Sequence, residues 1–453
     1  MNTEIFRQYD IRGMVDRDLT QDVARDIGRG YGTLAARQGC STLTCGRDGR
    51  THSQRLQQAL IQGIRETGCN VIDLGACPTP LLYFSIFHLK TDGGIMVTGS
   101  HNPPEYNGFK MCIGPQTIYG ESIQKIREII ESQDFTTGQG QYSTHDIITP
   151  YLSYMKENIH IEKPLTVVID AGNGVGGLVA PKAFEQAGCT VHQLYCDVDG
   201  TFPNHHPDPT IIENLKDLIE KVREVGADVG MAYDGDADRL GAVDENGNII
   251  YGDKLLLLFA RKILEKHPGA AIIGEVKCSK VLYDDIAAHG GRPIMWKTGH
   301  SLIKQKMKDE HALLAGEMSG HLFFADRYFG FDDGIYASLR LAEIIAQDDR
   351  PLSEFFKDVP VTFSTPEIRN ECPEKAKFEI VDRVKRWFQK NNYRIIDVDG
   401  VRVEFDDGWG LIRASNTQPV LVLRFEAQSM ERLKEIQELV ESRLEAVKKE
   451  VIQ

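Results

Sequence analysis

The amino-acid sequence predicts an α/β protein with three tandem α/β domains with mixed sheets and a C-terminal α+β domain. The chain has 453 residues, which is too many for one core, since domains commonly span roughly 100–200 residues. A strand–loop–helix–strand unit recurs three times along the chain. The C-terminal part instead shows a helix, a run of strands and a closing helix. Together these observations predict a four-domain architecture.

The repeated unit is visible as a change of hydrophobic period. In each copy a β-branched strand gives way to a 3.6-residue helical pattern that ends at glycine. This order is typical of βαβ crossovers and of parallel or mixed sheets. In the first copy we expect a strand at 41–45, a helix at 53–66 and a strand at 70–74. In the second copy we expect a strand at 165–170, a glycine loop followed by a helix up to 188, and a strand at 190–194. In the third copy we expect a strand at 271–275, a helix at 279–289 and a strand at 293–296.

The C-terminal part has a different order. A helix and four strands precede a charged closing helix, which favours an α+β domain. The expected elements are a helix at 378–390, strands at 394–397, 401–405, 411–414 and 420–426, and a helix at 430–451. A polar stretch at 133–143 suggests the first domain boundary. The segment 360–366 begins and ends with proline and suggests a hinge before the last domain. We expect domains at 1–146, 147–249, 250–360 and 361–453.

Composition narrows the class of protein. Hydrophobic residues make up 41% and charged residues 26%, as in ordinary globular proteins, and the net charge of −14 argues against nucleic-acid binding. The sequence lacks an apolar signal core and any apolar run near the roughly 20 residues of a membrane span. The nine cysteines form no Cys-x-x-Cys pair, which is typical of reduced thiols. We therefore expect a cytoplasmic protein that binds neither nucleic acid nor membrane.

A serine stands on a short loop after an expected strand at 93–99. Ser100 is framed by Gly99 and by Pro103, a rigid setting that suits a nucleophile or a phosphoryl carrier. His101 and Lys110 supply acid–base or charge-neutralising groups nearby. An ordinary turn remains the alternative for this serine, because glycine, serine and proline are common in turns.

Three carboxylates follow the next strand at alternate positions. Asp234, Asp236 and Asp238 would repel one another in a compact loop unless a divalent cation such as Mg²⁺ binds them. An EF-hand calcium loop is a rival, but its sixth position is Arg239 where glycine is required, and a strand precedes it. An exposed acidic turn is the second alternative. Arg239 suggests an anionic ligand beside the cation.

Five further segments carry glycine or polar ligand groups. The loop 172–177 matches the dinucleotide pattern G-x-G-x-x-G, although a tight turn is the preferred interpretation. The loop 413–419 offers an arginine and hydroxyl donors for a phosphate. The loop 316–321 offers a glutamate and a serine for sugar hydroxyls, and 297–301 is a further polar glycine loop. A turn with a helix N-cap is the alternative for each. Tyr9 and Arg12 lie on a short extended stretch near the start.

These motifs together resemble the α-D-phosphohexomutase family over the whole chain. The motifs that carry the resemblance are TGSHNP at 98–103, DGDADR at 234–239, GEMSGH at 316–321 and RASNT at 413–417. The sequence Glu-Met-Ser-Gly in the third motif is similar to that of the bacterial phosphomannomutase/phosphoglucomutase branch. The phosphoglucosamine branch typically has Glu-Gln-Ser-Gly there.

The resemblance implies a reaction and a set of site residues. Ser100 would be the phosphoserine, and Asp234, Asp236 and Asp238 would hold Mg²⁺ together with its phosphate. Hexose 1-phosphate and hexose 6-phosphate, of mannose or glucose, would interconvert through a reorienting hexose 1,6-bisphosphate, which is also the activator. The catalytic group would be completed by His101, Lys110 and Arg239, with the proton carrier either His101 or Lys110. The substrate-binding residues would be Tyr9, Arg12, Lys277, Thr298, Gly299, His300, Glu317, Ser319, Arg413, Ser415, Asn416 and Thr417.

Other functions stay open at this point. Phosphoglucosamine mutase within the same family is one alternative, and a metal-dependent serine phosphatase is another. The acidic loop 234–239 taken alone would suggest a calcium-binding protein, and the glycine loop 172–177 taken alone would suggest a nicotinamide dehydrogenase. We expect a phosphosugar as the only partner and a monomer, with a dimer as the alternative.

Overall fold

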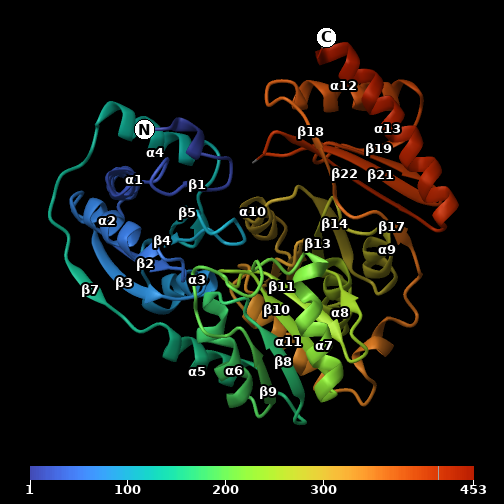
Figure 1. Ribbon diagram of the computed structural model, residues 1–453, viewed down its shortest axis with the longest axis horizontal. Helices are drawn as coiled ribbons and strands as arrows, with labels where there is room; N and C mark the ends of the chain where they lie inside the picture. The colour runs from blue at the N-terminus through green and yellow to red at the C-terminus, as the bar shows by residue number, and fades with distance from the viewer. Residues whose placement is uncertain (417, 453) are drawn as a thin grey trace.

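The computed structural model describes residues 1–416 and 418–452, and Thr417 therefore lies outside the described residues. Four sheets follow one another along the chain, with seven, five, four and six strands. In Figure 1 the first unit (blue) lies at the left, the second and third at the lower centre, and the last (red) at the upper right. None of the described helices is long and apolar enough to cross a bilayer.

The first sheet mixes parallel and antiparallel strands. Its order is β1-β5-β4-β2-β3-β7, with β6 beside β5. β2 runs parallel to β3 and β4, while β5 runs antiparallel to β4, so the β4–β5 connection that carries Ser100 projects from one edge of the sheet. The strands are β1 (Ile11–Met14), β2 (Thr42–Arg47), β3 (Asn70–Ala76), β4 (Gly93–Val97), β5 (Tyr106–Ile113), β6 (Gln116–Thr117) and β7 (Tyr142–Thr144). The helices are η1 (Thr3–Ile5), α1 (Gln21–Arg37), α2 (Ser53–Arg65), α3 (Thr79–Leu89) and α4 (Glu121–Ser132).

The second sheet has the order β12-β11-β10-β8-β9. The helix expected up to residue 188 is split into a short 3-10 turn and an α-helix, because Val179 leaves the helical region and Pro181 opens the next helix. The strands are β8 (Thr166–Asp170), β9 (Thr190–Leu194), β10 (Val229–Tyr233), β11 (Leu240–Asp244) and β12 (Ile249–Ile250). The helices are α5 (Ile148–Asn158), η2 (Val175–Leu178), α6 (Ala180–Gln186), η3 (Ile212–Leu215) and α7 (Lys216–Val225).

The third sheet is small and again mixed. Its order is β14-β13-β15-β16, with only the β15–β16 pair antiparallel. The strands are β13 (Ala271–Glu275), β14 (Arg292–Trp296), β15 (Leu314–Gly316) and β16 (Leu322–Phe324). The helices are α8 (Gly252–Lys266), α9 (Lys280–Ala288), α10 (His300–Glu310), α11 (Gly334–Ala346) and η4 (Leu352–Phe356).

The fourth sheet is antiparallel throughout. Its order is β17-β22-β21-β20-β19, with β18 also beside β22. The expected hinge 360–366 contains β17, which the sequence did not predict. The strands are β17 (Phe363–Ser364), β18 (Ile368–Glu371), β19 (Arg394–Ile396), β20 (Val401–Phe405), β21 (Gly408–Ala414) and β22 (Val420–Ala427), and the helices are α12 (Lys377–Lys390) and α13 (Met430–Ile452). Three mixed sheets and an α+β unit confirm the predicted fold class.

Helix α11 ties two units together. It follows the third sheet in sequence, yet it packs on β10 and β11 of the second sheet as well as on β16. All of its residues are buried, as expected for a helix that is apolar on nearly every side. The hydroxyls of Ser338 and Tyr233 join helix and strand at 2.6 Å. One hydrophobic cluster therefore extends through both units.

This shared core gives a stability prediction. Ile335, at the start of α11, is fully buried, so Ile335→Ala should lower the free energy of unfolding by about 3 kcal/mol through lost burial and a cavity. Ile212 is 50% exposed, and Ile212→Ala is the matched control with a change below about 0.5 kcal/mol. Urea denaturation of both variants measures the difference, and equal losses would contradict the packing role of α11.

Candidate active site

The serine loop brings Ser100 against the carboxylate loop of the second unit. The Ser100 hydroxyl donates to Asp234 Oδ2 at 2.8 Å and lies 3.1 Å from His101 Nδ1. Ser100 is 2% exposed and has a φ of +48°, in the left-handed region. Such backbone strain persists only where the surroundings enforce it. The first and second units therefore meet at this hydroxyl.

A buried arginine enforces the shape of the serine loop. The Arg50 guanidinium donates to the carbonyls of Ser100 (2.9 Å), Asn102 (2.5 Å), Pro103 (2.6 Å) and Tyr106 (3.1 Å). A side chain at Gly99 would place its Cβ only 2.4 Å from Arg50 Nε, so the loop requires glycine there. The sequence shows only a charged turn at 46–50, and our reading of it did not assign Arg50 to the site.

The three aspartates of the second unit are fully buried together. Asp234, Asp236 and Asp238 follow β10, with ligand atoms within 4.8 Å of one another. Burial, and then the charges of Asp236 and Asp238, raise the pKa of Asp234 well above its usual range. The part of this shift that comes from repulsion between the carboxylates is the part that a bound cation relieves.

The neighbours of these aspartates leave room for a cation. The Lys110 ammonium donates to Asp236 Oδ2 at 2.7 Å and to Asp238 Oδ2, and the Thr79 hydroxyl donates to Asp236 Oδ2 at 2.5 Å. Within the described residues, Asp236 Oδ1 and Asp238 Oδ1 have no hydrogen-bond partner. Buried carboxylate oxygens of this kind are ligands that a hard divalent cation accepts. The residues present therefore fit a divalent metal ion.

The calcium-loop alternative fails on the position of its last ligand. An EF-hand would bring Glu245 to the cation. Here the Glu245 carboxylate instead accepts hydrogen bonds from the Ser353 backbone N–H, at 3.1 Å, and from the Ser353 hydroxyl. Glu245 is not part of the aspartate cluster.

The electrostatics of the cluster separate the two candidate proton carriers. Burial alone would lower the pKa of Lys110, but Asp236, Asp238 and Asp234 raise it above its ordinary value. Burial, with Arg239 next, lowers the pKa of His101 well below its usual range. Lys110 is therefore held as a cation, while His101 is held neutral.

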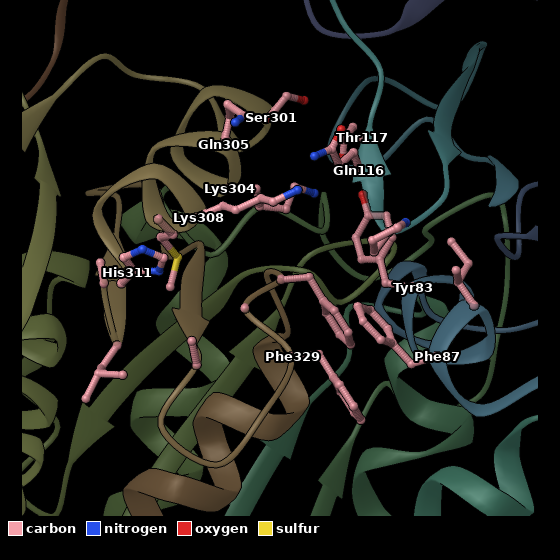
Figure 2. A pocket seen from close by; sticks show the side chains of 18 residues that line it. Tyr83, Phe87, Gln116, Thr117, Ser301, Lys304, Gln305, Lys308, His311 and Phe329 are labelled. Atoms are coloured by element: carbon pink, nitrogen blue, oxygen red, sulfur yellow. The ribbon is translucent and has the colours of Figure 1, made fainter. Parts of the chain in front are cut away.

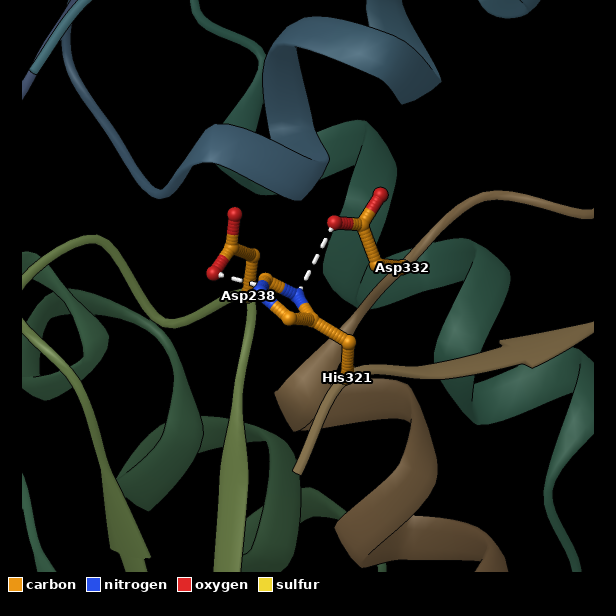
Figure 3. A group of neighbouring side chains, drawn as sticks. All are labelled: Asp238, His321 and Asp332. Atoms are coloured by element: carbon orange, nitrogen blue, oxygen red, sulfur yellow. Dashed lines mark ion pairs between the residues drawn. The ribbon is translucent and has the colours of Figure 1, made fainter. Parts of the chain in front are cut away.

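A histidine links the carboxylates to the third unit (Figure 3). Arg239 Nε donates to His321 Nε2 at 3.0 Å, so the proton of His321 resides on Nδ1. His321 Nδ1 lies 3.1 Å from Asp332 and 3.5 Å from Asp238. The motif 316–321 ends at His321, but our sequence reading did not include this residue in the site.

The loop 316–321 carries Glu317 and is supported by a second acid, Glu275. Glu317 accepts from the Gly299 backbone N–H at 2.7 Å and from the Ser319 hydroxyl at 3.1 Å. Glu275, at the end of β13, is fully buried and accepts from the Met318 backbone at 2.9 Å. Burial is the main cause that raises the pKa of Glu275. Glu275 was missed because it reads as the last residue of a strand.

The remaining predicted residues surround this loop. Tyr9 of the first unit donates to the Thr298 carbonyl at 3.0 Å and accepts from the Asn416 amide at 2.6 Å. Arg413 donates to Asp399 at 2.9 Å, and Lys277 donates to Glu367 at 3.0 Å. Burial raises the pKa of Tyr9 to about 12. Units one, three and four thus meet at the Tyr9 hydroxyl.

Three predicted residues lie at the margins of these groups. Arg12 donates to Asp10 at 2.6 Å and to Asn102 of the serine loop at 2.9 Å. His300 opens α10, and its ring stacks on His321 at 5.7 Å. The Ser415 hydroxyl accepts from the Gln418 backbone at 3.2 Å.

The glycine loop 172–177 supports the carboxylate loop. The Val175 backbone N–H donates to the Gly235 carbonyl at 3.2 Å, and a Cβ at Gly174 would lie 2.7 Å from that oxygen. The glycine therefore allows two backbones to approach closely. This close packing explains the G-x-G-x-x-G pattern of the loop, and no dinucleotide site is needed to explain it.

The fold and this shared centre define a phosphohexomutase-type architecture. Four phosphoglucomutase/phosphomannomutase domain families match the chain: alpha/beta/alpha domain I over 3–137, domain II over 149–247, domain III over 251–363 and the C-terminal domain over 367–442. The chain belongs to the phosphoglucomutase/phosphomannomutase family, which confirms the resemblance seen in its motifs.

Individual relatives are similar over nearly their whole length. A phosphomannomutase/phosphoglucomutase of Pseudomonas aeruginosa is 51% identical, with 98% of this chain and 96% of the relative covered. A phosphoglucomutase of Neisseria meningitidis is 47% identical, with 96% and 95% covered. The crystal structure of a phosphoglucomutase/phosphomannomutase family protein from Burkholderia thailandensis superposes with a TM-score of 0.94 at 44% identity, covering 99% of this chain and 98% of that one.

The Arg50 contacts give a second testable prediction. Lysine cannot reach four carbonyls from one point charge, so Arg50→Lys should lower the free energy of unfolding by about 2 kcal/mol. Among the described residues the exposed Arg386 pairs only with Asp382 of its own helix, so Arg386→Lys is the control. Thermal unfolding of both variants measures the loss. Identical midpoints would contradict the role of Arg50 in holding the serine loop.

Proposed function

We propose that this enzyme interconverts hexose 1-phosphate and hexose 6-phosphate, of mannose and glucose, with Ser100 as the phosphoryl carrier. The observation that carries the proposal is the buried Ser100 hydroxyl, hydrogen-bonded to Asp234 within the carboxylate–Lys110 cluster. The names of the Pseudomonas and Neisseria relatives support the same reaction.

The charge balance at Ser100 suits phosphoryl transfer. Asp234, Asp236 and Asp238 would hold Mg²⁺, whose charge offsets that on the transferred phosphoryl oxygens. Lys110 and Arg239 add fixed positive charge around the same point. Because the three aspartates and Lys110 are buried and Arg239 is largely buried, their fields act in a site of low dielectric.

His101 is the group that we assign to move the proton. When the bisphosphorylated sugar returns a phosphoryl group to Ser100, the P–Oγ bond forms and the bond from phosphorus to the sugar oxygen breaks. The proton of the Ser100 hydroxyl goes to His101 Nδ1, which lies 3.1 Å away and is neutral. Lys110 keeps its proton and stabilises the charge. His101 then gives this proton to the sugar oxygen that leaves phosphorus, so that the sugar regains its hydroxyl, and the reverse transfer returns the proton to Ser100 Oγ.

The other residues would hold the sugar and its second phosphate. Glu317 and Ser319 present oxygens for two adjacent sugar hydroxyls, and Arg413 with Asn416 would grip the phosphate that does not react. The hexose 1,6-bisphosphate must then turn end for end between the two groups of residues. The further residues that we propose for binding are Tyr9, Arg12, Lys277, Thr298, Gly299, His300 and Ser415, and Thr417 lies outside the described residues.

Sugar preference follows from what the loop reads. Glucose and mannose differ at C2, so a site that reads only O3 and O4 would accept both. An assay with mannose, glucose and glucosamine 1-phosphates, primed with hexose 1,6-bisphosphate, tests this. Turnover of glucosamine 1-phosphate alone would replace the proposal by the phosphoglucosamine alternative, and steady release of inorganic phosphate would favour a phosphatase. A monomer, a cytoplasmic location and no binding to nucleic acid or membrane remain predictions.

The carrier role predicts the effect of removing one oxygen. Ser100→Ala deletes the atom that bears the phosphoryl group, so kcat/KM in the primed mutase assay should fall at least about 10³-fold. Ser122→Ala, on α4 of the same unit, is the control and should keep its activity. Full activity of Ser100→Ala would sink the assignment.

The metal assignment predicts a changed magnesium titration. Asp236→Asn removes a charged ligand, so the Mg²⁺ concentration for half-maximal activity should rise by more than about tenfold. Asp349→Asn makes the same change at an exposed position and should leave the titration unaltered. An unchanged titration for Asp236→Asn would count against this loop as the metal site.

A further inference from the structure

A cavity of about 420 Å³ lies between the first and third units (Figure 2). Its walls are α3 and the strand β6 on one side, and α10 with the loop 325–331 on the other. None of the residues assigned above to the serine, metal, sugar or phosphate groups lines it. The volume falls in the range of about 300–1,000 Å³ that is usual for small-molecule sites.

One wall of the cavity is aromatic. The rings of Phe87 and Phe329 stack with centroids 4.5 Å apart, and Phe331 lies 6.0 Å from Phe87. Tyr83 contacts Phe331 at 5.4 Å. Phe329 is 37% exposed, so this cluster presents an apolar face toward the opening. A flat ring is the group that packs best on such a face.

The facing wall is one side of α10. Ser301, Lys304, Gln305 and Lys308 line the cavity, and their spacing places them on one helical face. Lys304 donates to Asp332 at 2.9 Å and lies 4.1 Å from the centre of the Tyr83 ring. Lys308 is exposed at the rim and has no ion-pair partner in the part of the chain that the structure describes. An unneutralised positive charge therefore faces an aromatic wall.

Two buried hydroxyls also line the cavity. Tyr83 is 3% and Ser301 is 1% exposed, and neither hydroxyl has a hydrogen-bond partner among the described residues. Buried polar groups are nearly always hydrogen-bonded. Both hydroxyls can donate to an oxygen of a ligand. The cavity is therefore apolar with a few converging donors, the usual composition of a ligand site.

We propose that this cavity binds a small aromatic carboxylate. The ring would pack on Phe87 and Phe329, and the carboxylate would lie toward Lys304 and Lys308, one helical turn apart. Tyr83 and Ser301 supply further donors around the ligand. A neutral aromatic ligand would make no ion pair with Lys308. A ligand with several negative charges would place some of them against the aromatic wall, where burying charge is unfavourable.

The position of the cavity couples this ligand to the reaction. Its walls belong to the unit that carries Ser100 and to the unit that carries Glu317, so a bound ligand holds the two units together. Lys304 also contacts Asp332, whose other oxygen lies 3.1 Å from His321 beside the metal loop. This part rests on the proposed function: occupancy should slow turnover without competing with the sugar phosphate.

Calorimetric titration with 2-naphthoate tests binding, in the presence of EDTA. Wild-type protein should bind one equivalent, and Lys308→Glu should weaken the affinity by about tenfold or more, since it reverses the charge at the rim. Lys182→Glu makes the same change on the exposed face of α6 and should bind like wild type. Absence of binding to wild type, or equal affinity of all three proteins, would overturn the site.

Competition and kinetics complete the test. Saturating glucose 1-phosphate should leave the naphthoate affinity unchanged, and displacement by it would place the probe at Ser100 and refute a separate cavity. In the mutase assay 2-naphthoate should lower kcat with the midpoint found by calorimetry, and Lys308→Glu should shift that midpoint by the same factor. Binding with unaltered kcat refutes the regulatory part. If no mutase activity exists, the proposed function fails while the calorimetric result on the cavity stands.

Discussion

The contact between the serine loop and the carboxylate loop is the constraint on which the rest of the structure depends. Three buried aspartates repel one another, and the compensating ammonium comes from Lys110 on a strand of a different unit. Neither unit alone can bury these groups at low cost, because an uncompensated charge in the interior is strongly unfavourable. The relative placement of the first two units is therefore set by charge as well as by apolar packing.

The shared core makes that placement stable. Helix α3 of the first unit and α11 after the third both lie within one hydrophobic cluster with the second sheet. Edge-to-face contacts of Phe84 with Tyr151 and Phe329 join three units around α3. The polar centre thus lies above a continuous apolar layer. The four units are distinct in topology, and the first three share one hydrophobic cluster while each keeps a smaller or separate cluster of its own.

The sequence predicted the regular parts because their signals are local. Strands such as β9, β13 and β20 were predicted at their observed bounds, since β-branched runs between glycines are read over a few residues. Arg50 could not be assigned, because its partners lie about 50 residues further along the chain and a charged turn residue is ordinarily exposed. Glu275 and His321 were not assigned to the site either, because Glu275 is the last residue of a strand and His321 is the last residue of a motif. Helical periodicity also does not say on which sheet α11 packs, and β17 is too short to show a period.

The hydrogen bonds that hold the fourth unit differ in strength from one end of the unit to the other. At its base Arg402 donates to the carbonyls of Val276 and Cys278 at 2.7 and 2.8 Å, which are charge-assisted bonds. At the tip of the fourth unit a neutral hydrogen bond, from Asn416 to Tyr9, reaches the first unit. A neutral bond contributes only about 1 kcal/mol net. In the proposed reaction the weaker contact at the tip would open while the base stays bound, so that the sugar could turn over without leaving the site.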